Sequence, residues 1–240
     1  MHKINFQERA VAFIDVLGFG SIVYQANQNP KHLKELEDLI DLLNKAVPDL
    51  NGQVDEHIPK ELIPKYIYIS DSIILSAPLT SKKMVNYNGL SILVMRVIQI
   101  THMLLNKGYL IRGGISIGNV WHTESNIVGV AYQEAYKIET RTSVPRVELS
   151  DSAIKYWYET EGESNKMCLN HDEHFMVNGL HDYYTPDNTH GATERAYAHY
   201  AQIAAQNINS ANSDCIRVKW QWYKNYIDSE INRNQFIMFT

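Results

Sequence analysis

Two aspartates and an arginine lie in the chain where their side chains suit phosphate chemistry. Asp15 comes near the end of an apolar run, residues 10–17, and Asp71 lies between two β-rich runs. Arg112 opens a glycine-rich segment, Arg112-Gly-Gly-Ile-Ser-Ile-Gly118. Carboxylates buried by strands on either side need a compensating positive charge, and a divalent metal ion is the usual one. We therefore predict that Asp15 and Asp71 bind metal, with the main-chain carbonyl of Val16 as a further oxygen ligand.

Each of these features also has a purely structural interpretation. A single aspartate at a strand end more often caps a helix or forms a turn, and only the pair favours a shared metal site. Gly18 and Gly20 permit a tight turn that either cradles a polyphosphate or simply joins a strand to a helix. Arg112 requires an anion, which is either a phosphate or a carboxylate of the protein. The residues alone leave these alternatives open.

Several other classes of function are disfavoured. The net charge of −5, from 22 basic and 27 acidic residues, argues against binding a nucleic-acid polymer. Cys168 and Cys215 match no metal or redox spacing and are expected to be reduced thiols. The His171-Asp-Glu-His174 segment is expected to be a solvated loop. No Gly-x-Ser-x-Gly elbow, Walker loop or Cys/His dyad is visible, which argues against hydrolases and P-loop proteins.

No segment of the sequence indicates a membrane. The N-terminus is polar and has no signal-peptide apolar core. The most apolar helical stretch, residues 90–105, is interrupted by Arg96, Gln99 and His102. We therefore expect a cytoplasmic protein.

The elements that must position these residues follow from hydrophobic periodicity. Residues 10–17 predict a strand buried on both faces, and 65–77 predict two short strands around Asp71. Pro48 should end one helix, Gly108 should end another, and Ser150 should cap a third. The remaining expected elements are helices at 33–47, 82–107, 129–141, 192–208 and 214–232, strands at 109–118 and 145–149, polar loops at 49–63 and 166–190, and one short strand at 174–178 within the second loop.

This order predicts an α+β fold of the ferredoxin-like kind rather than a doubly wound parallel sheet. We expect an antiparallel-rich sheet with covering helices, followed by C-terminal helices. The 240 residues should form a single domain, with a core at 9–150 and a C-terminal helical extension at 151–240.

In sequence order, these pieces resemble the class III nucleotidyl cyclases. Phe13-Ile-Asp15-Val-Leu-Gly-Phe19 is similar to the family's first metal-binding strand, and Asp71 to the acid on the following hairpin. The segment from Arg112 to Gly118 is similar to the family's Arg-x-Gly-Ile-x-x-Gly strand. Residues 129–139 are similar to its Gly-x-x-x-Asn-x-Ala-x-Arg-x-Glu helix. The resemblance covers about residues 9–150.

The resemblance implies a mechanism and a set of roles. Two divalent ions, Mg²⁺ or Mn²⁺, would lie between Asp15 and Asp71, where they lower the pKa of the ribose 3′-hydroxyl and neutralise the triphosphate. The substrate would be a nucleoside triphosphate, the site would lie at the interface of a homodimer, and the product would act on a downstream cyclic-nucleotide effector. The implied catalytic residues are Arg112, Lys137 and Gln133, with Arg141 and Arg146 as further candidate cations, and the implied substrate-binding residues are Gly18, Phe19, Tyr66, Tyr68 and Asn126.

The departures from the family pattern bear on specificity. Gln133 stands where the family has its transition-state asparagine, and Lys137 where it has arginine. Ile67 replaces the lysine that reads adenine, and an isoleucine forms no side-chain hydrogen bond. The Ser-Asp-Ser around Asp71, together with Ala-Tyr-x-Ile-Glu, Pro-Arg-Val and a late Val-Lys-Trp-x-Trp, resembles the pyrimidine cyclases of Pycsar antiphage defence.

That subtype would convert UTP or CTP to cyclic UMP or cyclic CMP as a second messenger. Two alternatives stay open from the residues. The first is a catalytically weak pseudo-cyclase that senses a nucleotide or a partner protein. The second is a purine cyclase with altered base contacts.

Overall fold

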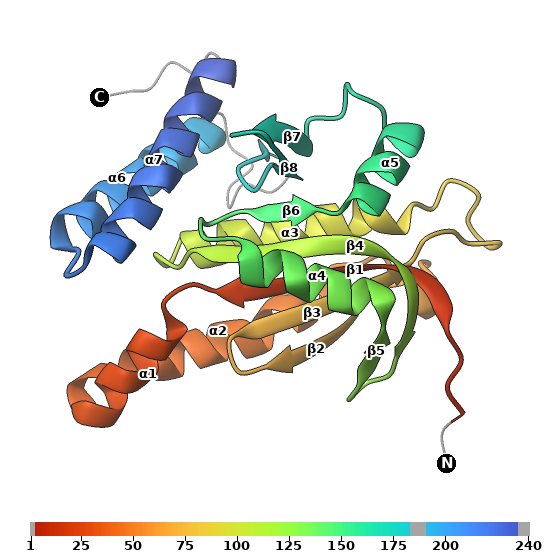
Figure 1. Ribbon diagram of the computed structural model, residues 1–240, viewed down its shortest axis with the longest axis horizontal. Helices are drawn as coiled ribbons and strands as arrows, with labels where there is room; N and C mark the ends of the chain where they lie inside the picture. The colour runs from red at the N-terminus through yellow and green to blue at the C-terminus, as the bar shows by residue number, and fades with distance from the viewer. Residues whose placement is uncertain (1–2, 183–190, 235–240) are drawn as a thin grey trace.

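The computed structural model describes residues 3–182 and 191–234. Its strands form an eight-stranded sheet in the order β2-β3-β1-β4-β6-β8-β7, with β5 pairing with β4 (Figure 1). The strands are β1 (Gln7–Val16), β2 (Lys65–Ile69), β3 (Ser72–Pro78), β4 (Ile111–His122), β5 (Ile127–Gly129), β6 (Val147–Leu149), β7 (Cys168–His171) and β8 (His174–Val177). The helices are α1 (Phe19–Gln28), α2 (Leu33–Gly52), α3 (Gly89–Leu105), α4 (Val130–Arg141), α5 (Asp151–Thr160), α6 (Ala192–Ser210) and α7 (Asp214–Asn234).

The strand pairing confirms the α+β fold class. Of the strand pairs in the described residues, β4 and β6 run parallel and the others run antiparallel. The central strand β1 pairs with β3 on one side and with β4 on the other. Asp15 of β1 therefore lies between β4, which carries Arg112, and β3, which follows Asp71. Within the described residues, no helix combines the length and apolarity that a membrane span requires.

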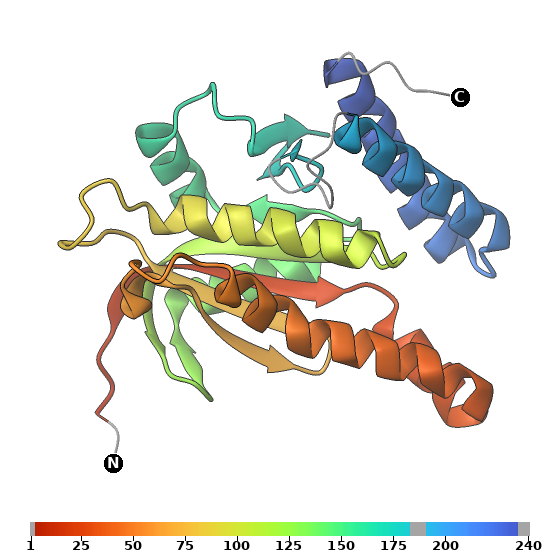
Figure 2. The ribbon, with the colours of Figure 1, turned by 180° about the vertical axis from the view of Figure 1, so that it is seen from behind.

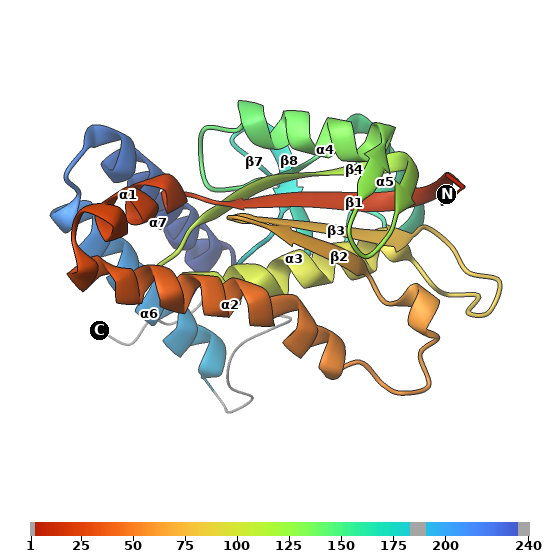
Figure 3. The ribbon, with the colours of Figure 1, turned by 90° about the horizontal axis from the view of Figure 1, so that it is seen from below.

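Helices cover both faces of this sheet. Figure 3 shows α4 on one face and α2 with α3 on the other, and Figure 2 shows α2 and α3 lying across the sheet. On β1, Ala12 and Ile14 join the core formed with α2 and α3, while Val11 and Phe13 pack against α4. Because side chains alternate along a strand, this double burial explains the continuous apolar run of β1.

Close contact between α4 and β4 depends on a glycine. A Cβ atom added at Gly114 would lie 2.5 Å from the carbonyl oxygen of Ala135 and 2.6 Å from the Cβ of Ile138. Helix α4 can therefore approach the sheet at this point because β4 has no side chain there. This approach places the end of α4 beside Arg112.

Most predicted elements are present, but several boundaries were wrong. Helix α2 continues through Pro48 to Gly52, because Leu50 is buried in the core and its packing offsets the hydrogen bond that proline removes. Helix α3 begins at Gly89 rather than at 82, since the side chain of Asn88 accepts hydrogen bonds from the main chain of Leu90 and Ser91. Gly108, with φ of 81°, follows the end of α3 as predicted.

Helix α1 and strand β5 were not predicted, and β7 and β8 form a hairpin where a single strand was expected. His171-Asp-Glu-His174 is the tight turn of that hairpin, with positive φ at Asp172 and Glu173, and these two residues are exposed to solvent. Ser150 caps α5 as predicted, accepting a hydrogen bond from the main chain of Ala153.

The C-terminal part of the chain has its own apolar cluster. Tyr197 and Tyr200 of α6 pack with Tyr223 and Tyr226 of α7, and the cluster reaches Leu105 at the end of α3. Residues 151–234 thus contribute α5, α6 and α7 together with the two strands β7 and β8. The division into a core at 9–150 and an extension at 151–240 stays a prediction.

Candidate active site

The structure brings the two aspartates together. Asp15 is the penultimate residue of β1, and Asp71 lies in the turn between β2 and β3, beside Ser70 with φ of 58°. Asp15 pairs in register with Ser72, and the main-chain N–H of Val16 donates to the carbonyl of Asp71 at 3.2 Å. Besides burial, the neighbouring Asp71 carboxyl group raises the pKa of Asp15, as expected for two acids that lie close together. Two acids separated by 56 positions in the chain therefore share one site.

Arg112 joins this pair and connects it to a third carboxylate. Its Nε lies 3.4 Å from Oδ2 of Asp15, and its Nη2 lies 2.7 Å from Oε1 of Glu139. Its Nη1 donates to the carbonyl of Thr142 at 3.2 Å. The anion that Arg112 binds within one chain is thus a carboxylate of the protein. Its shorter contact is with Glu139 rather than with Asp15.

Glu139 was not predicted as a site residue, although the sequence carried a signal. Ala131, Ala135 and Glu139 are spaced four apart, so they lie on one face of α4, and all three are buried. Glu139 is only 4% exposed. An acid in a stripe that otherwise faces the sheet requires a charged partner, which here is Arg112.

The site carries more negative charge than its protein cations balance. Burial, followed by the carboxylates of Asp71 and Glu139, raises the pKa of Asp15 to about 7, and Arg112 opposes this rise. When Asp15, Asp71 and Glu139 are all ionised, three carboxylates face one guanidinium group. The excess of two negative charges matches the charge of one divalent cation.

The donor chemistry also fits Mg²⁺ or Mn²⁺. Carboxylate and main-chain oxygens are the ligands that hard divalent cations prefer. Asp15 and Asp71 supply the carboxylates, and Val16 lies between them at the end of β1. In residues 3–182 and 191–234 no group of three or more His, Cys, Asp and Glu side chains has a geometry suited to a metal ion. The pair would therefore need oxygen ligands from the main chain, the substrate or water.

The glycine turn after Asp15 forms a strand-to-helix connection. Gly18 has a φ of 87° and precedes α1, and its carbonyl accepts hydrogen bonds from Ser21 and Ile22. The main-chain N–H groups of Phe19 and Gly20 belong to the first turn, which has no intrahelical acceptors. Both interpretations of this turn are thus compatible with the structure, because helix N-termini also favour anions. The ring of Phe19 packs partly against the core on the α2 and α3 side.

The two predicted base-reading tyrosines do not share a face with Asp15. Tyr68 packs against the core on the α2 and α3 side, and Tyr66 has the same parity on β2. Asp15 has the parity of Phe13, which faces α4. Ile67, with the opposite parity, lies on the α4 side and is buried against Phe13 and Ile74. Burial raises the pKa of the Tyr68 hydroxyl, and the negative charge of the Asp71 carboxylate raises it further. The Tyr68 side chain therefore senses Asp71, although it lies on the other face of the sheet from Asp15.

Asn126 is also separated from the metal pair within one chain. It is exposed in the β4–β5 turn, where its carbonyl accepts a hydrogen bond from the main chain of Thr123. Nearby, the carbonyl of His122 accepts a hydrogen bond from Lys65, the first residue of β2. Asp71 lies two residues past the other end of that strand, so the length of β2 separates Asn126 from the aspartates.

Gln133 and Lys137 are exposed on the side of α4 that faces away from the sheet. They lie one turn apart and line a cavity of about 440 Å³ with Arg141 and Asp151. Arg141 and Arg146 contact the buried Glu148, at 3.7 Å and 2.7 Å, and not Asp15. Of the predicted catalytic residues, only Arg112 therefore reaches the aspartates in a single chain.

Comparisons with known proteins give resemblance at the level of fold. No family model and no curated protein matches the chain. Among solved structures, the adenylyl cyclase CyaB from P. aeruginosa matches with 14% identity and a TM-score of 0.46, over 73% of this chain and 94% of that one. The catalytic core of a rhodopsin-guanylyl cyclase with converted specificity, in complex with ATPαS, matches with 19% identity and a TM-score of 0.48, over 72% and 95%.

A third solved structure covers more of the chain. A class III adenylyl cyclase-like ATP-binding protein from Pseudomonas aeruginosa matches with 11% identity and a TM-score of 0.47. The match spans 95% of this chain and 44% of that one. Similarity at this level defines neither a substrate nor an activity, so function has to be inferred from the side chains of the site.

Proposed function

We propose that the protein is a nucleotide cyclase that converts UTP or CTP to the 3′,5′-cyclic monophosphate and pyrophosphate. The observation that supports this most directly is the juxtaposition of Asp15 and Asp71, with an excess of negative charge that divalent cations would balance. A triphosphate bound by such cations needs no large basic surface, in agreement with the net charge of −5. We infer that the protein is an enzyme whose active site lies at the end of β1, beside the turn between β2 and β3.

The reaction joins the ribose 3′-oxygen to the α-phosphorus while the bond from that phosphorus to the pyrophosphate oxygen breaks. The hydroxyl proton passes to solvent. Asp15, Asp71 and the Val16 carbonyl would hold two ions, Mg²⁺ or Mn²⁺, which when bound lower the pKa of the 3′-hydroxyl and neutralise the triphosphate. Main-chain N–H groups at Gly18 and Phe19 would bind phosphate oxygens. Because the attack is intramolecular, positioning and charge stabilisation supply most of the rate.

The side chain at position 67 argues against adenine, and the resemblance of the Ser-Asp-Ser around Asp71 to the pyrimidine cyclases supports a pyrimidine. Ile67 lies on the α4 side and presents no hydrogen-bonding group, so it cannot pair with an adenine edge. We propose that the product is a second messenger in antiphage defence and acts on a cyclic-nucleotide effector in the cytoplasm. Asn126 and Tyr68, a residue within β2, remain the proposed base contacts.

We further propose that each site forms between two copies of the chain. The outer side of α4 carries Gln133 and Lys137 beside the exposed apolar side chains of Val130 and Tyr136. In a homodimer this side of α4 would face the aspartates of the second copy. That arrangement would supply the two catalytic side chains that a single chain keeps away from Asp15.

The activity is tested by incubating the purified protein with each of the four nucleoside triphosphates and Mn²⁺, followed by detection of cyclic product. Product from UTP or CTP supports the proposal, and product from ATP or GTP only would identify a purine cyclase. The Asp71→Ala variant should lose turnover and keep its fold. The matched control is Asp41→Ala, at an exposed position of α2. Unchanged turnover in Asp71→Ala would remove the metal assignment.

The dimer is tested separately by mixing two inactive variants, Asp71→Ala and Lys137→Ala. In a two-fold dimer with composite sites, half of the dimers are mixed, and each mixed dimer keeps one intact site. We therefore expect recovery of about a quarter of the wild-type activity. No recovery after subunit exchange, shown independently by labelled chains, would contradict a site shared between copies.

A nucleotide sensor without turnover is the second candidate. It is favoured by the contacts of Arg112, which both Glu139 and Asp15 already engage. Saturable binding of a triphosphate without product from any of the four nucleotides would support this candidate and exclude the cyclase.

A further inference from the structure

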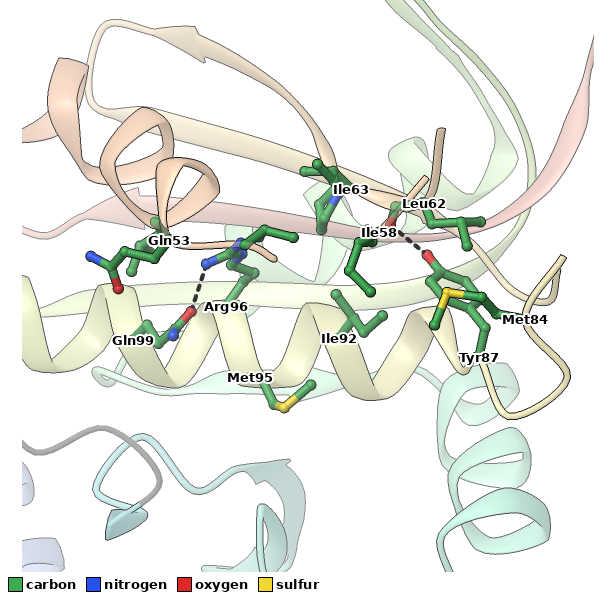
Figure 4. Close-up of a pocket in the computed structure, with 13 residues that line it drawn as sticks. Gln53, Ile58, Leu62, Ile63, Met84, Tyr87, Ile92, Met95, Arg96 and Gln99 are labelled. Carbon is green, nitrogen blue, oxygen red and sulfur yellow. Dashed lines mark hydrogen bonds between the residues drawn. The ribbon is translucent and has the colours of Figure 1, made fainter. Parts of the chain in front are cut away.

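Two further cavities of similar volume contain one basic side chain each. The first, of about 410 Å³, lies between the end of α2, the segment 53–64 and α3 (Figure 4). Its Arg96 donates to the side-chain oxygens of Gln99, at 3.0 Å, and Asn51, at 3.2 Å, and is therefore already engaged. The second, of about 370 Å³, is lined by α1, the connection from α3 to β4, and the turn between α6 and α7. Its basic side chain is Lys219 of α7, whose ammonium group forms no ion pair or hydrogen bond within the part of the chain that the structure describes.

The second cavity adjoins the candidate active site. Gly18 and Ser21, at the start of α1, line one of its walls. The main-chain N–H of Leu17 donates to the carbonyl of Leu110 at 2.9 Å, which continues the pairing of β1 with β4 into this wall. Gly18 follows Asp15 by three positions, so the two residues are at most about 11 Å apart along the chain. A phosphate chain that begins at the aspartates can therefore extend toward the cavity.

The polar lining of the cavity suits phosphate oxygens. It consists of one ammonium group, one carboxylate and several side chains with hydroxyl or amide groups, which are Ser21, Gln25, Asn207, Ser210 and Asn212. The carboxylate is that of Glu35, which is exposed at the start of α2, whereas Lys219 is half-buried. A lysine ammonium group offers three donors and no acceptor, and it binds phosphate as a point charge. Because Lys219 is partly withdrawn from water, its attraction for an anion is screened less than that of an exposed cation.

The segment around Lys219 fixes its position. It is the Val-Lys-Trp-x-Trp segment, residues 218–222, which has no role in the site proposed above. Trp220 is 6% exposed and packs in the apolar cluster of α6 and α7. Nε1 of Trp222 donates to Oδ2 of Asp172, in the turn between β7 and β8, at 2.7 Å. These two contacts attach α7 to the rest of the protein directly after Lys219.

We propose that this cavity receives the terminal phosphate of a bound nucleoside triphosphate, with Lys219 as its cationic partner. The identity of the substrate rests on the proposed function, and the inference adds a role for the C-terminal helices α6 and α7 in binding it. A diphosphate ends one phosphate earlier, so it lacks the group that contacts Lys219. The cavity therefore selects a triphosphate over a diphosphate.

The role of Lys219 is tested by isothermal titration calorimetry with inorganic tripolyphosphate and Mn²⁺, which requires no base and no turnover. The Lys219→Gln variant should bind at least about tenfold more weakly than the wild type, which corresponds to the loss of one charge-assisted contact. Lys219→Arg keeps the charge and should restore most of the affinity. The matched control is Lys224→Gln, because Lys224 is on the same helix, pairs with Asp228 and does not line the cavity. Wild-type affinity in Lys219→Gln, or no saturable binding by the wild type, would overturn the proposal.

The length of the phosphate chain gives a second measurement. The wild type should bind tripolyphosphate at least about tenfold more tightly than pyrophosphate, and Lys219→Gln should lose this preference. Glu35→Gln removes the acid of the lining and should tighten tripolyphosphate binding by about two- to fivefold. Weaker binding by Glu35→Gln would place the phosphate outside the cavity.

These measurements separate the inference from the proposed function. Absence of cyclic product from all four nucleoside triphosphates would refute the cyclase and leave the tripolyphosphate affinities to decide the role of Lys219. Equal tripolyphosphate affinities of the wild type and Lys219→Gln would refute the role of Lys219 even in an active cyclase.

Discussion

The stability of the protein should depend on pH through the buried side chain of His102. This residue of α3 is 1% exposed, and its ring connects the central core to the C-terminal helices. Nδ1 lies 2.9 Å from the hydroxyl of Tyr200, and Nε2 lies 2.9 Å from the carbonyl of His181. A neutral ring that donates from Nε2 and accepts at Nδ1 satisfies both contacts.

Burial lowers the pKa of His102 from 6.5 to about 4, against a smaller rise from its hydrogen bond to the His181 carbonyl. Because the folded state disfavours the proton, the unfolded state binds more protons between these two values. Stability is therefore complete above about pH 6.5 and falls as the pH approaches 4. The linkage relation gives a loss of about 2 kcal/mol between pH 7.5 and pH 5 for this one group.

The measurement is the free energy of unfolding in urea at both pH values for the wild type and for His102→Gln. We expect the wild type to lose about 2 kcal/mol more than the variant over this interval. His57→Gln, at a side chain that is 85% exposed, is the control for histidine removal and should keep the wild-type pH dependence. Equal losses in the wild type and in His102→Gln would refute the reasoning.

Two further predictions concern the packing and charge of the candidate site. Gly114→Ala should destabilise the protein by about 1–3 kcal/mol in urea unfolding, because the added Cβ would lie 2.5 Å from the Ala135 carbonyl oxygen. The control is Gly52→Ala, which should not destabilise the protein because no atom lies within 4 Å of the added Cβ. Glu139→Gln should weaken Mn²⁺ binding by about tenfold in calorimetric titration, since it removes one carboxylate and leaves Arg112 to pair with Asp15. Undiminished Mn²⁺ affinity in Glu139→Gln would contradict the charge balance described for the site.

The sequence predicted the elements that periodicity defines and located the acids at strand ends. It could not show that α2 continues through Pro48, because the burial of Leu50 that stabilises the last turn is a tertiary contact. It also could not separate Tyr66 and Tyr68 from the face of Asp15. Both faces of this sheet are covered by helices, so the apolar pattern of β2 does not reveal which side each residue faces.

The role of Arg112 within one chain depends on Glu139, which was not predicted as a site residue. The sequence left its anion open between a phosphate and a protein carboxylate, and the structure shows Glu139 and Asp15. The spacing of Ala131, Ala135 and Glu139 places this acid on one face of α4, but only the packing of that face against β4 at Gly114 brings it to Arg112. Pairing between distant segments therefore decides which charges meet, and local pattern does not.

The two contacts of Arg112 have different consequences for cation binding. If Asp15 were its only partner, a divalent cation that took over Asp15 would leave a half-buried guanidinium group without an anion, at a cost of several kcal/mol. Glu139 removes this cost, because Arg112 keeps its 2.7 Å contact there and its hydrogen bond to the Thr142 carbonyl when the 3.4 Å contact with Asp15 is lost. We therefore expect that a bound metal ion can replace Arg112 as the cationic partner of Asp15 without disturbing α4. The Mn²⁺ affinity of Glu139→Gln measures how much the pair of Glu139 and Arg112 contributes to this exchange.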